Sequence, residues 1–280
     1  MIIIKQASHL AAYINREKAR QQQIGFVPTM GALHEGHLAL IKQSKAETGV
    51  TVCSIFVNPT QFNNPSDYQK YPITLDKDIE QLETAGTDIL FLPSIAEMYP
   101  GGTTQLEQYD LGYLETVLEG KYRPGHFQGV CQVMSRLLNM VQAHRLFMGQ
   151  KDYQQCMVVK QLLKLINSST QFVTCPTMRE PDGLAMSSRN MRLSPTDRQK
   201  ATTIYKALTL IKNQLQGNNW PDVQQQAQSL LTGHGFTIDY VELADADTLE
   251  LTTSKKDKPL VTLIAAWLQD VRLIDNMTLI

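Results

Sequence analysis

The chain has 280 residues, of which 42% are hydrophobic and 19% are charged, and its formal net charge is -1. This composition is typical of a globular protein with a buried core, and it excludes a disordered, collagen-like or membrane-spanning chain. Lysine and arginine alternate with acidic residues along the chain, which excludes the concentrated positive charge that nucleic-acid binding requires.

The cysteines and the apolar runs bear on the compartment. Cys53, Cys131, Cys156 and Cys175 form no CxxC pair and have no histidine placed to complete a zinc site, so we expect buried, reduced thiols and no metal-ligating residue. The three isoleucines near the N-terminus are too few for a signal peptide, and residues 261–268 are too few to span a membrane. We therefore expect a cytoplasmic protein with no membrane or nucleic-acid partner.

Short β-branched or aromatic runs alternate with helical patterns over the first 176 residues. Each run suits a strand that is buried on both faces. The runs are Ile24–Val27, Val50–Val57, Ile89–Leu92, Arg145–Met148 and Phe172–Cys175. Apolar residues between the runs recur at helical spacing, as in Leu75, Ile79 and Leu82. This alternation predicts an α/β fold with a parallel sheet and helices on both faces, in which ligands bind beyond the carboxyl ends of the strands.

The pattern changes beyond Leu193. Ser194-Pro195 is typical of a helix start, and that helix should reach about Gln216. A further helical segment and three strand-like runs follow, at residues 221–231, 237–243, 260–266 and 271–274. The sequence therefore predicts two domains, residues 1–176 with the parallel sheet and residues 177–280 as a smaller α+β domain.

The first segment rich in chemistry is PTMGALHEGHL, residues 28–38, where a predicted strand ends and a helix begins. Its glycines allow the backbone to approach a ligand, and the free N–H groups of a helix N-terminus attract phosphate. His34 and His37 could then act together as hydrogen-bond donors to phosphates. A single histidine would fit a core or surface position better, but two in HxGH at a helix start favour a nucleotide site. A zinc site is weaker, because no third ligand is evident.

Three more segments should converge on the same edge of the sheet. VNPTQF, residues 57–62, offers the neutral amide of Gln61, although alone it would be only a loop. In GQKDYQQ, residues 149–155, Lys151 can meet a phosphate, Asp152 can accept from a ribose hydroxyl, and Gln155 lies one helical turn beyond Lys151. REPDGLAMSSRN, residues 179–190, has two hydroxyls and a guanidinium that could clamp a triphosphate, although it also fits a serine-rich turn that caps the next helix.

Together with RPGHFQGV, residues 123–130, these segments resemble the signature segments of the pantothenate synthetases, in order and at suitable spacing. HxGH alone marks a broad superfamily of nucleotidyltransferases and class I aminoacyl-tRNA synthetases. The resemblance covers the whole chain and implies a Rossmann-like nucleotide-binding domain, a homodimer, and ATP with Mg²⁺. It implies the condensation of (R)-pantoate with β-alanine through a pantoyl adenylate, which yields pantothenate, AMP and pyrophosphate.

The resemblance also implies roles for individual residues. The ATP site would comprise Met30, Gly31, Ala32, Leu33, His34, Glu35, Gly36, His37, Gly149, Gln150, Lys151, Asp152, Met178, Met186, Ser187, Ser188 and Arg189, the last four in a mobile loop over the triphosphate. The catalytic residues would be His37, His34, Lys151 and Arg189. The substrate-binding residues would be Gln61, Gln155, Asn58, Arg123 and His126.

The sequence departs from the family pattern at three places, none of them among these residues. Ile73 stands where the pattern has Arg, Ala143-His144 where it has Pro-Asp, and Met148 where it has Phe. Asp76 and Asp78 could serve a metal, but they fit a solvated helix face better.

Two alternatives remain open. One is another HxGH-type nucleotidyltransferase or adenylate-forming ligase that acts on a different small acid. The other is a nucleotide-binding regulatory module without turnover.

Overall fold

The computed structural model describes residues 1–63, 65–215, 217–254 and 258–279, and these form two compact units. The first unit comprises residues 1–150 and 154–176, and the second comprises residues 151–153 and 177–280. The second unit therefore takes in residues 151–153, which the sequence-based division places in the first domain.

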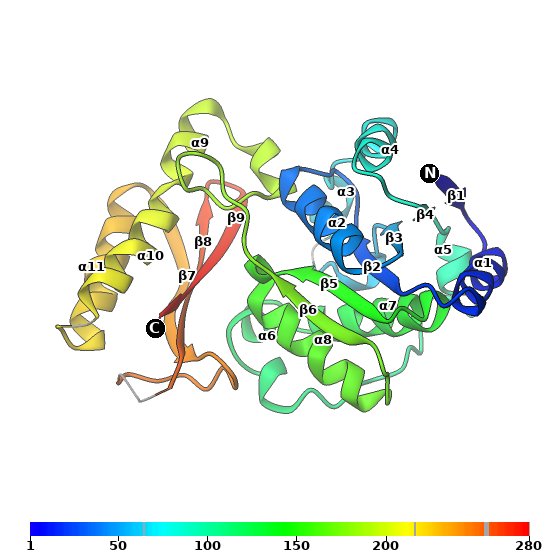
Figure 1. Cartoon of the computed structure of the whole chain (residues 1–280). Coiled ribbons are helices and arrows are strands. Elements are labelled where there is room, and N and C mark those ends of the chain that lie inside the picture. Colours follow the sequence, from blue (N-terminus) through cyan, green and yellow to red (C-terminus); the bar gives the residue numbers. More distant parts are fainter. Residues whose placement is uncertain (64, 216, 255–257, 280) are drawn as a thin grey trace. The chain divides into compact units, whose positions relative to one another are not determined.

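The first unit is built on a parallel sheet of six strands in the order β1-β4-β3-β2-β5-β6 (Figure 1). The strands are β1 (Ile2–Ile4), β2 (Ile24–Thr29), β3 (Val50–Ile55), β4 (Ile89–Phe91), β5 (Arg145–Gly149) and β6 (Gln171–Cys175). The helices are α1 (Ala7–Ala19), α2 (Glu35–Glu47), η1 (Pro59–Gln61), α3 (Pro65–Gln69), α4 (Leu75–Thr84), α5 (Ile95–Met98), η2 (Gly112–Glu115), α6 (Leu118–Tyr122), α7 (His126–Val141), η3 (Gln150–Asp152) and α8 (Tyr153–Leu165). The expected α/β class is confirmed.

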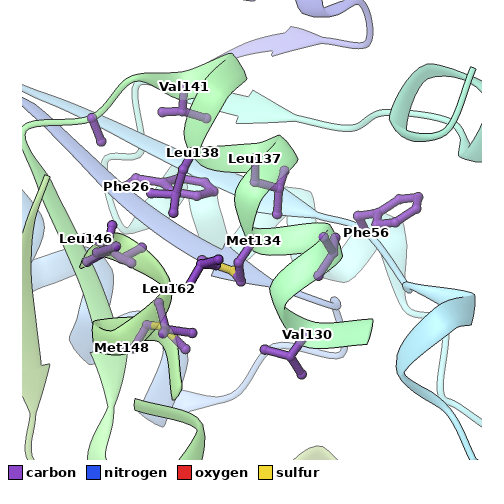
Figure 2. Close-up of a cluster of buried hydrophobic side chains, with 14 of the residues drawn as sticks. Phe26, Phe56, Val130, Met134, Leu137, Leu138, Val141, Leu146, Met148 and Leu162 are labelled. Carbon is purple, nitrogen blue, oxygen red and sulfur yellow. The ribbon is translucent and has the colours of Figure 1, made fainter. Parts of the chain in front are cut away.

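Helices cover both faces of this sheet because neighbouring strand residues point to opposite sides. Phe26 packs in a buried cluster with side chains of α1, α7 and α8, whereas Val27 packs with side chains of α2 and α4. Figure 2 shows Met134 and Leu138 of α7 in the first cluster, beside Phe26 and Leu146. The central strands are thus buried on both faces.

The second unit is an α+β unit with an antiparallel sheet in the order β7-β8-β9. Its elements are η4 (Ser188–Arg192), α9 (Pro195–Ala201), α10 (Thr203–Gln214), α11 (Trp220–Gly233), β7 (Phe236–Asp245), β8 (Leu260–Leu268) and β9 (Val271–Leu279) (Figure 1). The sheet and the three α-helices share one buried cluster, which includes Leu208, Val223 and Ile264.

Two elements differ from the expectation. The helix expected from Pro195 to about Gln216 is divided at Thr202, whose hydroxyl donates to the carbonyl of Gln199 at 2.8 Å and so competes with the helical backbone. Strand β1 was not expected, because three consecutive isoleucines are too few to show the alternation of a strand. It is a strand because it pairs with β4.

Candidate active site

The connection from β2 to α2 is a tight turn with two residues in the left-handed region. Gly31 has φ +83° and Ala32 has φ +48°, which is uncommon for a residue with a side chain. The hydroxyl of Thr29 accepts a hydrogen bond from Gly31 N at 3.2 Å and donates to the carbonyl of Ser54 at 2.7 Å. The turn is therefore held to the end of the neighbouring strand β3.

A buried carboxylate from α4 binds the same turn. Asp78 is 1% exposed; its Oδ2 accepts from Ala32 N at 2.9 Å and its Oδ1 accepts from Leu33 N at 2.8 Å. Thr74 Oγ1 also donates to Asp78 Oδ1, at 3.0 Å. The expectation of a solvated helix face for Asp78 is wrong, because the turn covers it. The hydrogen bonds that the Asp78 carboxylate accepts from the N–H groups of Ala32 and Leu33 stabilise the turn.

The two histidines of HxGH form the N-terminal cap of α2. His34 Nδ1 accepts from Gly36 N at 3.1 Å, and His37 Nδ1 accepts from His34 N at 3.4 Å. A nitrogen that accepts carries no proton, so each neutral ring holds its proton on Nε2, which is then a donor. The ring centroids lie 4.1 Å apart. The pair can therefore supply two N–H donors from one helix start.

This cap corrects part of the expectation for the segment. We expected free backbone N–H groups at the start of α2, but Gly36 N donates to His34 Nδ1 and His37 N donates to the carbonyl of His34 at 2.8 Å. A histidine cap satisfies the orphan donors of a helix start as serine or aspartate does elsewhere. The backbone N–H groups of Gly36 and His37 therefore already have acceptors within the helix start.

The Gln61 loop, residues 58–61, lies close to the first turn. Gln61 Nε2 lies 3.2 Å from Met30 Sδ, so the structure brings the second predicted segment against the first. Asn58 is 1% exposed and donates from Nδ2 to Gln61 Oε1 at 3.2 Å and to the carbonyl of Gly129 at 3.1 Å. His126, which begins α7 and is 5% exposed, donates from Nδ1 to the carbonyl of Gln61 at 2.8 Å.

Asn58 and His126 were expected to bind substrate, and in the structure both side chains contact Gln61. Asn58 binds its side chain, His126 binds its carbonyl, and each is almost fully buried. Arg123 lies 3.6 Å from Glu119 in an ion pair at the end of α6. Gln155 is half-buried on α8.

The segment after β5 is divided between the units. Gly149 ends β5, and its carbonyl accepts from Cys156 Sγ at 3.3 Å. Lys151 and Asp152 lie in η3, which continues directly into α8 at Tyr153, so Lys151 and Gln155 lie in consecutive helical turns, the first of them a 3₁₀ turn. Lys151 groups with the second unit, where its carbonyl accepts from Asn276 Nδ2 at 2.8 Å.

In the second unit, residues 178–186 form a narrow loop. Arg179 and Ala185 pair as an antiparallel bridge, and Met186 N donates to the carbonyl of Met178 at 3.0 Å. Gly183 has φ +91°, and a side chain there would strike the ring of Tyr205. The backbone of this loop is therefore fixed at its tip and at both arms.

The AMSSRN part of the loop continues into η4. Ser187 caps η4, with Oγ accepting from Arg189 N at 3.3 Å. Asn190 Nδ2 donates to the carbonyl of Ala185 at 3.0 Å. Met186, Ser187 and Arg189 are half-buried, whereas Ser188 is 7% exposed. Ser188, which the sequence assigns to the triphosphate, is thus the most buried of these residues in the structure.

A buried ion pair anchors this loop. Arg179 Nη1 and Nη2 donate to Asp275 at 2.6 and 3.0 Å, and Nη1 also donates to the carbonyl of Gly183 at 3.1 Å. The guanidinium lies 4.6 Å from the centroid of the Tyr205 ring. Burial raises the pKa of Asp275, and the Arg179 guanidinium opposes that shift.

Sequence reasoning did not find the residues that hold the turns and loops of each unit in place. They are Asp78, Tyr99, Gly129 and Asp275. Asp78 was noted in the sequence only as part of a helix face, and its contact with Leu33 left no signal there. Tyr99 gave no signal, and Gly129 lies in the RPGHFQGV segment but had no role assigned to it, because each acts through a partner far away in sequence.

Comparison with known proteins adds to this geometry. The profile of the Pantoate-beta-alanine ligase family matches residues 2–278. The pantothenate synthetase of Cytophaga hutchinsonii is 45% identical over the full length of both chains. The chain belongs to the pantoate-beta-alanine ligase family. Membership confirms the family that the five segments indicate, and with it the enzyme class, a ligase that forms a C–N bond.

Solved structures of the family agree with the fold. The crystal structure of pantothenate synthetase from Thermus thermophilus has a TM-score of 0.92 at 39% identity, and 99% of each chain is covered. Pantoate-beta-alanine ligase from Francisella tularensis, complexed with beta-gamma ATP and beta-alanine, has a TM-score of 0.83 at 40% identity, with 99% and 97% covered.

Two further observations bear on the earlier expectations. No helix among the described residues is long and apolar enough to cross a membrane. Ile73, at the position where the family pattern has Arg, is 83% exposed, so its side chain makes little contact with the rest of the unit.

Proposed function

We propose that the chain catalyses the ATP-dependent condensation of (R)-pantoate with β-alanine through a pantoyl adenylate. The observation that carries the proposal is the paired-histidine start of α2, with its two Nε2–H donors, in a chain matched by this family over its full length. The complex of the Francisella tularensis ligase with an ATP compound and β-alanine supports the same nucleotide and amine substrates. A different small acid is not favoured, because the full-length relatives are pantothenate synthetases.

In the first step, the pantoate carboxylate attacks the α-phosphorus of ATP and pyrophosphate leaves. The carboxylate is already ionised, so no protein nucleophile is needed and the enzyme must orient two anions and neutralise developing charge. We assign the donors to His34 and His37 and the cations to Lys151 and Arg189. In the second step, the neutral amine of β-alanine attacks the activated carbonyl and AMP leaves.

The remaining roles keep the sequence-based assignments. Residues 30–37 and Gly149, Gln150, Lys151 and Asp152 would contact the nucleotide, together with Met178 and residues 186–189. Gln61 and Gln155 would hold pantoate. The contacts of Asn58 and His126 support an indirect role for both, through the loop that carries Gln61.

Mg²⁺ is implied by the family resemblance. The described residues include no group of three or more His, Cys, Asp or Glu side chains that could hold a metal ion. Asp78, which we considered for a metal, has both oxygens bound to backbone N–H groups. We therefore propose that Mg²⁺ enters with ATP on its phosphate oxygens and assign no step to a metal held by protein side chains.

The test is exchange of labelled pyrophosphate into ATP. Exchange that depends on pantoate, and that a panel of other small acids does not support, is expected for this function. Exchange supported by another acid would transfer the assignment to another adenylate-forming ligase. ATP binding without exchange, and without AMP release after β-alanine is added, would indicate a regulatory module. We also propose that the chain forms a homodimer and acts in the cytoplasm. Light scattering of the purified chain measures its mass in solution and so tests the dimer.

A further inference from the structure

A buried chain of hydrogen bonds leads from Tyr99 to the Gln61 side chain. Tyr99 directly follows α5 and is 3% exposed. Its hydroxyl lies 2.7 Å from Asn58 Oδ1, and Asn58 Nδ2 donates to Gln61 Oε1 at 3.2 Å. The Tyr99 ring is held by the Arg136 guanidinium, 4.8 Å from its centroid, and by the ring of Phe56.

Two backbone groups fix the direction of this chain. The carbonyl of Gly129 can only accept, and it lies 3.1 Å from Asn58 Nδ2. The N–H of Thr60 can only donate, and it lies 3.4 Å from Asn58 Oδ1. The oxygen and nitrogen of the Asn58 amide therefore cannot exchange places, and the Tyr99 hydroxyl must be the donor to Oδ1.

The same logic fixes the Gln61 amide. Its Oε1 accepts from Asn58, so its NH₂ group is the end that remains for a ligand, and Nε2 lies 3.2 Å from Met30 Sδ. A thioether is a weak acceptor, so a carboxylate or hydroxyl oxygen would displace it readily. Gln61 thus presents a donor, which suits the acceptor oxygens of a hydroxy acid.

We propose that Tyr99 is a positioning residue: its hydroxyl makes the shortest hydrogen bond to Asn58 Oδ1 and holds Asn58 in the orientation that the backbone groups set, so that Gln61 presents its NH₂ group to the oxygens of pantoate. The identity of the acid rests on the proposed function. Burial raises the pKa of Tyr99, so the hydroxyl keeps its proton, and with it the donor role, throughout the neutral range.

The test is Tyr99→Phe, which removes the hydroxyl and keeps the ring. Tyr109→Phe is the matched control, because Tyr109 is 7% exposed in the same buried cluster and its hydroxyl binds Glu107 at 2.9 Å. Both changes are made in the wild-type chain and in Gln61→Ala. Pantoate-dependent pyrophosphate exchange gives kcat/KM for pantoate, and the KM for ATP is measured alongside.

Loss of one buried hydrogen bond should lower kcat/KM for pantoate about tenfold in Tyr99→Phe, with the KM for ATP unchanged. In the Gln61→Ala background the same change should have little effect, because Tyr99 acts through Gln61. An equal loss in both backgrounds would overturn the proposal, as would a Tyr99→Phe variant that matches Tyr109→Phe.

Two safeguards keep the result decisive. If Tyr99→Phe does not fold, Thr60→Val replaces it in both backgrounds, because Thr60 Oγ1 donates to the same Asn58 oxygen at 3.2 Å. A wild-type chain without pantoate-dependent exchange would overturn the proposed function and the inference together. Normal wild-type exchange with no coupling between Tyr99 and Gln61 would overturn the inference alone.

Discussion

The Asp78 carboxylate accepts a hydrogen bond from the backbone N–H of Leu33 at 2.8 Å, although the two residues lie 45 positions apart. This contact and the one to Ala32 stabilise a turn in which Ala32 adopts a left-handed conformation. A carboxylate that accepts two backbone N–H groups in a buried site orients the turn more firmly than neutral groups would. The position of His34 at the start of α2 therefore depends on α4.

Asp78→Asn should destabilise the first unit and weaken adenylation. One end of the amide would place N–H against a backbone N–H, so the unfolding free energy should fall by about 2–3 kcal/mol. Asp76→Asn, an exposed position in the same helix, is the control and should leave stability unchanged. Chemical denaturation of both variants measures the difference, and equal stability would contradict the structural role of Asp78.

His37→Asn separates the two roles of His37. The Asn side chain can still accept from a backbone N–H at the helix cap, but its amide ends short of the Nε2 position, so no N–H donor stands there. We expect a folded protein whose pantoate-dependent exchange is slower by about a hundredfold or more, since one donor aimed at developing charge has that effect. Lys42→Ala, exposed on α2, should exchange at the wild-type rate. Normal exchange by His37→Asn would refute the phosphate role.

Gly129→Ala tests the packing of α7 against the Gln61 loop. An added Cβ would lie 2.7 Å from Gln61 Cα and would also strike the backbone of Thr60. Overpacking of this kind costs about 1–3 kcal/mol and should move the loop, so the KM for pantoate should rise. Gly101→Ala, where an added Cβ has open space, is the control. Urea unfolding and substrate titration together decide the result, and a Gly129→Ala variant indistinguishable from Gly101→Ala would show that the loop has room.

The ion pair between Asp182 and Arg198 should make the second unit slightly sensitive to acid. The hydrogen bond from Arg198, at 2.8 Å, lowers the pKa of Asp182. A lowered folded-state pKa adds stability above the unfolded pKa, near 3.9, and that stability is lost as the pH falls through the folded value. The pair is exposed, so screening limits its effect to under about 1 kcal/mol.

Unfolding of wild type and Asp182→Asn between pH 6 and pH 2.5 measures this contribution. The stability difference between the two proteins should be present at pH 6 and vanish at the acid end, and added salt should reduce it at pH 6. A stability difference between the two proteins that persists at the lowest pH would show that Asp182 stabilises the unit through the hydrogen bond from Leu184 N rather than through its charge.

The sequence by itself determined the class of fold and the segments that carry chemistry. The buried runs such as residues 50–55 have no polar face, so they could only be internal strands, and HxGH after the first of the predicted strands placed two donors at a helix start. The sequence did not predict the short strand β1, which depends on its pairing with β4. It also did not predict the division of the helix at Thr202, which depends on the hydrogen bond of the Thr202 hydroxyl.

Only the tertiary structure decided which groups hold the site in place. Whether a carboxylate is solvated or buried depends on what packs over it. The sequence therefore predicted a surface position for Asp78, whereas the structure covers it with the turn at Leu33. The polarity of the Gln61 amide likewise depends on Asn58, Gly129 and Tyr99, which meet only when α5 and α7 pack against η1. Sequence patterns report periodicity and local turn chemistry, whereas hydrogen-bond direction in a buried site is set by partners that are distant along the chain.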